Sequence, residues 1–199
     1  LNDQFTEMEH EAVSYHNNPY LPKNIHQYRV AMRRLRSLLK FIKPMIAEES
    51  YDELNQLLKN LGKNLSPIRD LDVFIEKLDE TAREYPNLID NYADVFHFLH
   101  ERRLKSVNEQ ATEENMEPSS EILSQVREKL DRLSLNLEDE SYADYLEERF
   151  DKKRSKLKEE YEEAEEADYE HIHETRKMAK QVRYTANGYR KVLPKKKAK

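Results

Sequence analysis

Two stretches of the sequence concentrate basic side chains at a helical spacing. In the first, His26, Arg29, Arg33, Arg36 and Lys40 follow one another at intervals of three, four, three and four residues. Residues three and four apart lie on one face of an α-helix, so these five side chains would form a stripe about 21 Å long. The arginine fork and a histidine that gains a proton near neutral pH are both suited to binding phosphate groups.

A second stretch near the end of the sequence repeats this spacing. His173, Arg176, Lys180 and Arg183 follow at intervals of three, four and three residues, and Arg190 extends the stripe. Like charges one turn apart on a helix repel each other by a few tenths of a kcal/mol per pair. A stripe of one sign is tolerated more easily where a polyanion neutralises it. The two stretches therefore favour binding of a phosphate-rich anion.

The charge distribution along the chain supports this interpretation and also offers an alternative to it. The 199 residues carry a formal net charge of -6, but no acid occurs from Lys23 to Lys43 or from Thr175 to Lys199. Glu138–Glu170 holds fifteen acids and six bases. A solvated basic face that pairs with this acidic segment would explain the stripes without a ligand. The twofold occurrence of the whole pattern favours the ligand-binding interpretation.

The composition predicts an all-α fold. Only 2 glycines occur, 37% of the residues are charged, and no period-2 run of β-branched residues indicates a strand. The apolar face opposite the first stripe is expected in the core and consists of Tyr28, Ala31, Leu35, Leu38, Leu39 and Ile42. Ser66-Pro67 is read as an N-cap followed by proline at the first helical position, and Pro118-Ser119-Ser120 as a break with a new N-cap. Helices are predicted at about 1–16, 23–46, 50–64, 66–85, 88–115, 120–136, 140–167 and 169–193.

The two basic stretches suggest an internal duplication of a helical bundle, with Pro118 near the boundary. We expect a first half at 1–117, a second half at 118–193 and a basic tail at 194–199. The sequence contains no cysteine and no apolar run of about 20 residues, the length that a membrane span needs. The acidic beginning of the sequence does not look like a signal peptide. A cytoplasmic protein is therefore expected.

Three sequence elements together resemble the CHAD family, a helical domain named for its histidines. They are HQYRVAMRRLR, then LGKNLSPIRDLDVFIEKL, and later HETRKMAKQVRY. The resemblance implies two pseudo-symmetric antiparallel helical bundles around a basic central cleft. It also implies binding of inorganic polyphosphate, sometimes beside a triphosphatase domain or at storage granules. It assigns anion-binding roles to His26, Arg29, Arg33, Arg34, Arg36, Arg69, His173, Arg176, Lys177, Lys180, Arg183 and Tyr184.

The sequence departs from the family pattern in two places. The family usually continues with further helices after the second basic helix, whereas this sequence stops at Lys199. The acidic segment Glu138–Glu170 is also heavier than the family leads us to expect, which would reduce or regulate anion affinity. Phosphate and sulfate ions are expected to bind as small substitutes for the longer anion.

Several smaller patterns leave alternatives open. Arg69 is expected to reach the anion while Asp70 holds a basic side chain, but acids at this point would also complement a helix dipole. Arg149, Lys153 and Lys156 are interpreted as a solvated face, because glutamates lie nearby, and so is the pair Arg102-Arg103.

Two other functions compete with anion binding. Glu7-x-x-His10 and Glu170-x-x-His173 match half of a di-metal carboxylate site, although the partner glutamates cannot be singled out. A nucleic-acid-binding module would use the same cations together with an exposed aromatic such as Tyr184. Because the basic helices offer no metal-binding carboxylates after Glu174, we expect a binding module without a cofactor or metal rather than an enzyme.

Overall fold

The fold was analysed in a computed structural model that describes residues 1–88, 92–135, 141–164 and 168–193, together with the backbone but not the side chains of 113–118. Across these ranges the chain forms eight α-helices and two short 3-10 helices and no strand, which confirms the all-α prediction. The α-helices are α1 (Asn2–Asn17), α2 (Pro22–Ile42), α3 (Glu48–Asn64), α4 (Ser66–Glu84), α5 (Tyr92–Gln110), α6 (Glu113–Asp131), α7 (Tyr142–Glu162) and α8 (Tyr169–Gly188). The 3-10 helices are Lys43–Met45 and Pro86–Leu88.

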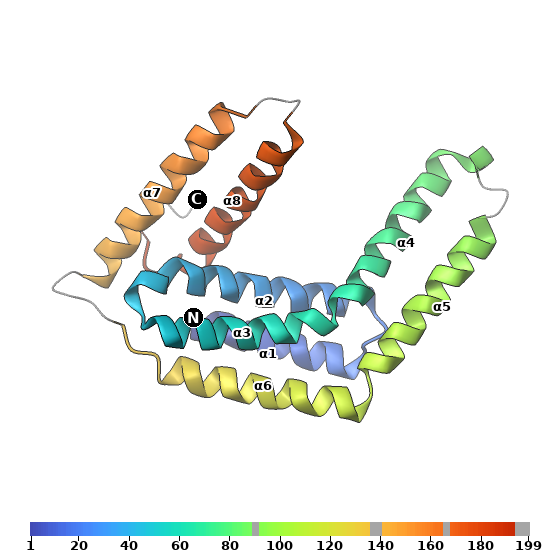
Figure 1. The fold of residues 1–199 in the computed structure, drawn as a ribbon, viewed down its shortest axis with the longest axis horizontal. Coiled ribbons are helices and arrows are strands. Elements are labelled where there is room, and N and C mark those ends of the chain that lie inside the picture. The colour runs from blue at the N-terminus through green and yellow to red at the C-terminus, as the bar shows by residue number, and fades with distance from the viewer. Residues whose placement is uncertain (89–91, 136–140, 165–167, 194–199) are drawn as a thin grey trace.

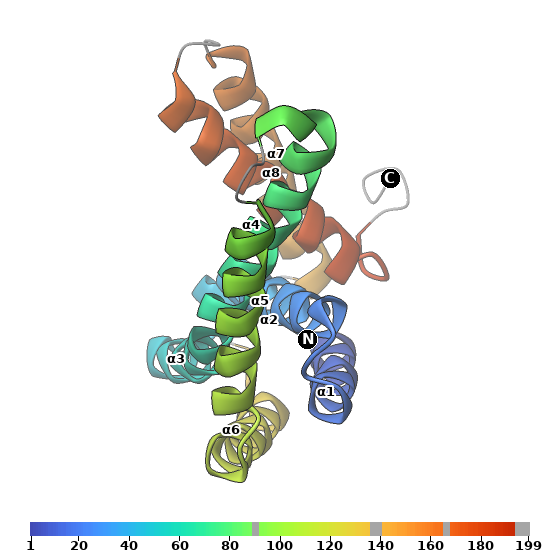
Figure 2. The same ribbon diagram turned by 90° about the vertical axis from the view of Figure 1, so that its right-hand side faces the viewer.

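Four of the helices form a base from which two helical hairpins rise. In Figure 1, α1, α2, α3 and α6 run alongside one another, and Figure 2 shows them clustered when viewed end on. The α4–α5 hairpin rises near the beginning of α2, and the α7–α8 hairpin rises near the end of α2 (Figure 1). Both hairpins therefore flank the upper face of α2, which carries the first basic stripe.

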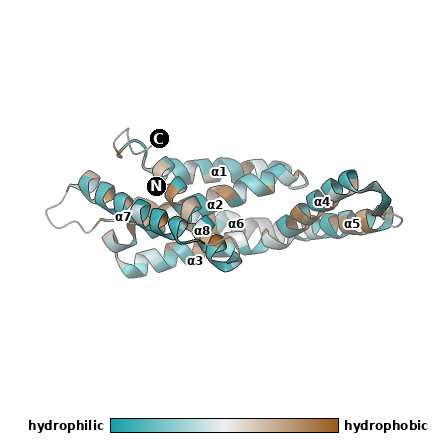
Figure 3. Cartoon of the chain, turned by 90° about the horizontal axis from the view of Figure 1, so that it is seen from above, coloured by the Kyte–Doolittle hydropathy of each residue, from teal (hydrophilic) through white to brown (hydrophobic). Residues whose placement is uncertain are grey.

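The core of the base lies where its four helices meet. Phe5 and Met8 of α1, Leu35 of α2, Leu58 of α3 and Val126 of α6 are all buried there. Every residue of the predicted apolar face of α2 is buried, so that prediction is confirmed. Burying each large aliphatic side chain contributes about 1.5–3 kcal/mol, which holds α2 with its basic face outward. Figure 3, coloured by residue hydropathy, shows that hydrophilic residues predominate along the helices.

A second core attaches the α7–α8 hairpin to the end of α2. Phe41 and Ile42 of α2 pack with Phe150 of α7 and with Tyr189, which follows α8. The Tyr189 hydroxyl donates a hydrogen bond of 3.3 Å to the Leu38 carbonyl, and its burial raises the pKa of the phenol far above its usual value. The end of α8 is therefore fixed against α2, the helix that carries the other stripe.

The structure corrects several predicted boundaries. No helix break occurs at Pro118, because α6 begins at Glu113 and continues through it. The second predicted helix ends at Ile42, since Lys43 precedes Pro44 and a residue before proline disfavours the helical conformation. Helix α8 ends at Gly188 rather than near residue 193.

The predicted division into two halves is not tested by the helix packing. Helix α6 belongs to the predicted second half yet packs against α1 and α3 of the first. The division at 117/118 and the pseudo-symmetry stay predictions, and the basic tail 194–199 lies outside the described residues. None of the helices that the structure describes combines the length and the apolar character that a membrane crossing requires.

Candidate anion-binding site

The first basic stripe lies on the outer face of α2. His26, Arg33 and Lys40 are spaced seven residues apart, so they lie close to one line along the helix. Arg33 and Lys40 are exposed, and His26 is half-buried. Among the described residues, no ion pair joins Arg33 or Lys40 to an acid. The middle of the stripe is therefore positive and open to solvent.

Three other predicted anion-binding residues of α2 have partners within the protein. Arg34 pairs with Glu7 of α1 at 2.5 Å, and Arg36 donates a hydrogen bond of 3.1 Å to the Asn55 amide oxygen of α3. Both lie at the edges of the stripe, where neighbouring helices approach. Their guanidinium groups help to join α2 to α1 and α3. Only the N–H groups that do not bond to Glu7 or Asn55 could therefore contact an anion.

Arg29 is tied to the junction between α3 and α4. Its Nη1 atom donates hydrogen bonds to the Gly62 carbonyl at 3.0 Å and to the Ser66 hydroxyl at 2.8 Å. Ser66 itself donates to Gly62, so it does not form the N-cap hydrogen bond expected from the sequence. Partial burial and the nearby charge of Arg33 lower the pKa of Arg29. The junction therefore holds Arg29 beside Arg33.

His26 lies where the stripe of α2 meets α4. Burial, followed by the positive charges of Arg69, Arg33 and Arg29, lowers the pKa of the imidazole, and Glu76 opposes this shift. The free protein therefore disfavours a protonated His26. A phosphate group placed among the same cations would cancel their repulsion and favour the protonated form.

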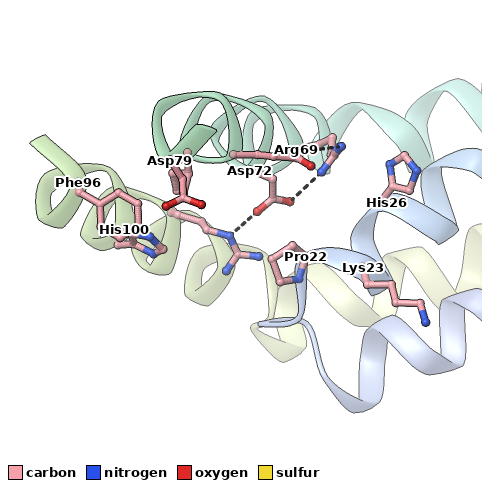
Figure 4. A pocket seen from close by; sticks show the side chains of 11 residues that line it. Pro22, Lys23, His26, Arg69, Asp72, Asp79, Phe96 and His100 are labelled. Atoms are coloured by element: carbon pink, nitrogen blue, oxygen red, sulfur yellow. Dashed lines mark hydrogen bonds and ion pairs between the residues drawn. The ribbon is translucent and has the colours of Figure 1, made fainter. Parts of the chain in front are cut away.

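A pocket with a volume of about 540 Å³ opens at the beginning of α2, between α4 and α5. Figure 4 shows Lys23 and His26 on the α2 side, and Phe96 with His100 across the pocket on α5. The Phe96 and His100 rings pack together, with their centroids 4.3 Å apart. The pocket thus continues the α2 stripe toward the α4–α5 hairpin.

Asp72 organises the basic residues of this pocket. Its carboxylate, whose side chain is 2% exposed, accepts a hydrogen bond from Arg103 Nε of α5 and lies 4.0 Å from Arg69 Nη1 (Figure 4). Asp72 therefore holds basic side chains in place, which is the role predicted for Asp70. Asp70 is exposed and acts on Arg29 through its charge. The sequence interpretation gave Asp72 no role, although its spacing of three residues from Arg69 places both on one helix face. The interpretation of Arg103 as part of a solvated face was wrong, because Arg103 is buried against Asp72.

The second stripe lies along α8 and is mostly exposed. His173, Arg176, Lys177, Lys180 and Arg183 are all exposed. Within the described chain, Lys177 pairs with Glu174 at 2.6 Å, and no ion pair joins Arg176, Lys180 or Arg183 to an acid. The half-buried Tyr184 ring has the Arg183 guanidinium 5.4 Å from its centroid. Arg190 follows the end of α8 and is also exposed.

The acidic helix α7 neutralises its own bases rather than the two stripes. The ion pairs Lys152–Glu148, Arg154–Asp151, Lys156–Glu160 and Lys158–Glu162 lie within the helix. In the described part of the chain, one ion pair crosses from α7 to α8, between Glu160 and His171 at 3.3 Å, and His171 is outside the predicted stripe. Pairing with the acids of α7 therefore does not account for the exposed cations.

Arg149 and Lys153 differ from the other bases of α7. Arg149 Nε donates a hydrogen bond of 2.6 Å to the Phe41 carbonyl, and both cations lie over the Phe41 ring. Burial, Arg149 and Lys40 together lower the pKa of Lys153. The interpretation of these two residues as a solvated face was wrong, because the end of α2 packs against them.

A metal site finds no support in the side chains that the structure describes. No group of three or more His, Cys, Asp or Glu residues in that part of the chain is placed to hold a metal ion. Glu7, which belongs to one of the two Glu-x-x-His patterns, pairs with Arg34 and accepts from Gln4. Glu170 and His173 lie on the exposed surface of α8.

Comparison with known proteins gives one family and two related folds. The sequence profile of the CHAD domain matches residues 3–199. The fold is similar to PptA from Streptomyces chartreusis, with a TM-score of 0.68 and 14% identity over 93% of this chain and 71% of that chain. It is also similar to the crystal structure of the CHAD domain from the plant Ricinus communis, with a TM-score of 0.62 and 21% identity over 92% of this chain and 61% of that chain. No curated protein matches this chain.

Proposed function

Because this chain belongs to the CHAD domain family, we propose that it is a non-enzymatic module that binds inorganic polyphosphate or a similar phosphate-rich anion. The supporting observation is the set of exposed cations that have no acid partner among the described residues. These are Arg33 and Lys40 on α2 and Arg176, Lys180 and Arg183 on α8. A protein with a net charge of -6 has many acids available, yet none of those that the structure describes forms an ion pair with these cations.

The attachment of α8 to α2 supports a site shared by both stripes. The contact through Leu38 and Tyr189 keeps two positively charged helices adjacent, although their charges repel each other. An anion bound across both stripes would remove this repulsion and gain contacts from each helix. In the proposed complex, the phosphates run along α2 past Arg33 and Lys40 and also contact Lys180 of α8.

A competition experiment tests the ligand class. Labelled long-chain polyphosphate bound to the protein should be displaced by unlabelled polyphosphate at much lower concentration than by duplex DNA of equal total charge, as followed by fluorescence anisotropy. Equal displacement by DNA would instead support a nucleic-acid module. Incubation with polyphosphate and Mg²⁺ or Mn²⁺ should release no phosphate, and turnover would contradict the non-enzymatic part of the proposal.

Charge reversal tests which residues bind. Arg33→Glu and Lys180→Glu should each weaken polyphosphate binding by about tenfold or more, because each replaces an attraction by a repulsion. Both side chains are exposed, so circular dichroism should show an intact helical fold. Lys105→Glu is the matched control, since Lys105 is exposed on α5, a helix that packs against α4 and α6, and lies two residues after Arg103 on the side of α5 opposite the pocket. If the control weakens binding as much as the two variants, the anion is held by overall charge and the proposed site is wrong.

A further inference from the structure

We propose that the pocket between α2, α4 and α5 is an end-binding subsite that takes the terminal phosphate group of the anion. This inference rests on the proposed function, because it assigns a direction to the bound chain. His26 connects the two sites, since it belongs to the α2 stripe and also lines the pocket. A chain that follows the stripe from Lys40 toward His26 reaches the α4–α5 hairpin at this pocket (Figures 1 and 4).

The second observation is the unsatisfied guanidinium of Arg103. Arg103 is 8% exposed and lines the pocket, and its Nε atom is hydrogen-bonded to Asp72. Its buried Nη2 atom has no hydrogen-bond partner in the described part of the protein. A buried donor without a partner costs free energy that a bound acceptor would recover. The Arg103 side chain is thus held in place by one carboxylate and keeps a donor for a ligand.

The charges around the pocket leave the α2 side positive. Asp72 is shared by Arg103 and Arg69, and Asp79 is paired with Arg83 at 2.6 Å. Glu76 lies 3.9 Å from Arg69 Nη2. No ion pair of Lys23 occurs among the described residues, and Lys23 stands at the beginning of α2, where the helix dipole adds positive potential. Lys23, Arg69, Arg103 and His26 can therefore surround one anionic group.

A terminal phosphate suits these donors better than an internal one. A terminal group has three non-bridging oxygens and gains a second negative charge near neutral pH. An internal phosphate of the chain has two such oxygens and one charge. Arginine side chains at two sides of the group can donate to different members of these three oxygens. The pocket would accordingly distinguish chain ends from chain interiors, whereas the open α2 and α8 stripes would not.

The test compares short polyphosphate with free ends and polyphosphate whose two ends carry uncharged alkyl groups. The capped chain is lengthened so that both probes have the same total charge. The unmodified protein should bind the free-ended probe about tenfold more tightly, as expected for one additional charged hydrogen-bonded contact. Orthophosphate should weaken binding of the free-ended probe until it equals that of the capped probe. The affinity for the capped probe should stay unchanged.

Two variants test whether the preference for free chain ends arises in the pocket. Arg103→Lys keeps a positive charge beside Asp72 but removes the free Nη2 donor, and Lys23→Gln removes an exposed cation that has no ion-pair partner among the described residues. Both should bind the two probes equally, whereas the control Lys105→Gln should retain the preference for free ends. Lys23→Gln keeps the test valid if Arg103→Lys does not fold.

The outcomes separate this inference from the proposed function. If the unmodified protein binds free-ended and capped probes equally, the end-binding subsite is wrong and polyphosphate binding stands. If orthophosphate binds the pocket but the two probes bind equally, the pocket takes free phosphate and the inference is also wrong. If neither probe binds, the proposed function itself fails.

Discussion

At the scale of single residues, the basic side chains divide into those with partners and those without. Arg29, Arg34 and Arg36 are bound to the scaffold, whereas Arg33 and Lys40 are exposed beside them. This division means that the first group positions and stiffens the site, while the second group offers most of its free charge. The two groups have the same residue types and alternate on the same helix, so residue type alone does not separate them.

His26 should make polyphosphate binding depend on pH. Its pKa is lowered in the free protein and should rise when phosphate replaces the repulsion of the surrounding arginines. Binding should then take up a proton, so affinity should increase as the pH falls through the range of histidine. Isothermal titration calorimetry in two buffers of different ionisation enthalpy measures this uptake. His26→Gln should remove the share of this uptake that the histidine contributes, and equal proton uptake by the variant and the unmodified protein would contradict the prediction.

Asp72 should be important for stability because it lies between two arginines in a nearly buried position. Asp72→Ala leaves Arg103 buried without its partner, and breaking a buried ion pair in this way costs about 3–5 kcal/mol of unfolding free energy. Urea denaturation measures the loss. Replacing both partners, by Asp72→Leu with Arg103→Met, should cost less than Asp72→Ala alone. If the double variant is the less stable of the two, the loss does not come from the unpaired charge.

At the scale of the elements, the junction of α8 with α2 determines how the two stripes are placed. The phenol of Tyr189 reaches the Leu38 carbonyl, and Arg149 of α7 reaches the carbonyl of Phe41 near the end of α2. Phe41 is among the last four residues of α2, whose carbonyls lack partners within the helix, and Leu38 lies just before them. The α7–α8 hairpin thus stabilises the C-terminal end of α2.

Gly188 should be required for this junction. A Cβ atom at position 188 would lie 2.5 Å from both Cδ atoms of Leu38, which is fully buried. Gly188→Ala should therefore lower the unfolding free energy by about 1–3 kcal/mol through overpacking, and Leu38→Ala in the same chain should relieve part of the clash.

Gly62→Ala is the matched control, because its Cβ atom would meet only Met32 Sδ at 3.9 Å. The control should be neutral or stabilising by up to about 1 kcal/mol, since alanine favours the helix. Equal melting temperatures for Gly188→Ala and the unmodified protein would show that α8 does not pack on α2 as described.

At the scale of the whole molecule, a negatively charged protein presents two positive faces. The acids of α7 are largely paired with bases of α7, so the net charge of -6 does not neutralise the stripes of α2 and α8. The overall charge would slow the approach of a polyanion at low ionic strength, while the local stripes would hold it once bound.

Salt should weaken polyphosphate binding steeply, because binding releases counterions from the phosphate chain. The logarithm of the association constant should fall linearly with the logarithm of the salt concentration, as measured by anisotropy titrations. Arg33→Gln should reduce the slope by about 0.7, the value for loss of one contact to a single strand, and Lys105→Gln should leave it unchanged. A flat salt dependence in the unmodified protein would mean that the basic stripes are not the site.

The sequence by itself determined the helices and the face of α2 that enters the core. Both follow from a periodicity of about 3.6 residues that is repeated within each segment, and so both are local properties. The basic stripes were visible for the same reason. The break predicted at Pro118 does not occur, because the packing of α6 against α1 and α3 outweighs the local cost of a proline within a helix.

Only the tertiary structure decided which basic side chains have partners within the protein and which of them line the same pocket. Arg34 is paired with a glutamate 27 residues away, Arg103 with an aspartate 31 residues away, and Tyr189 with a carbonyl 151 residues away. Such partners depend on how distant helices pack, and no spacing within one helix encodes them. The same holds for the pocket at the beginning of α2, because its walls come from three helices that are brought together only when the chain folds.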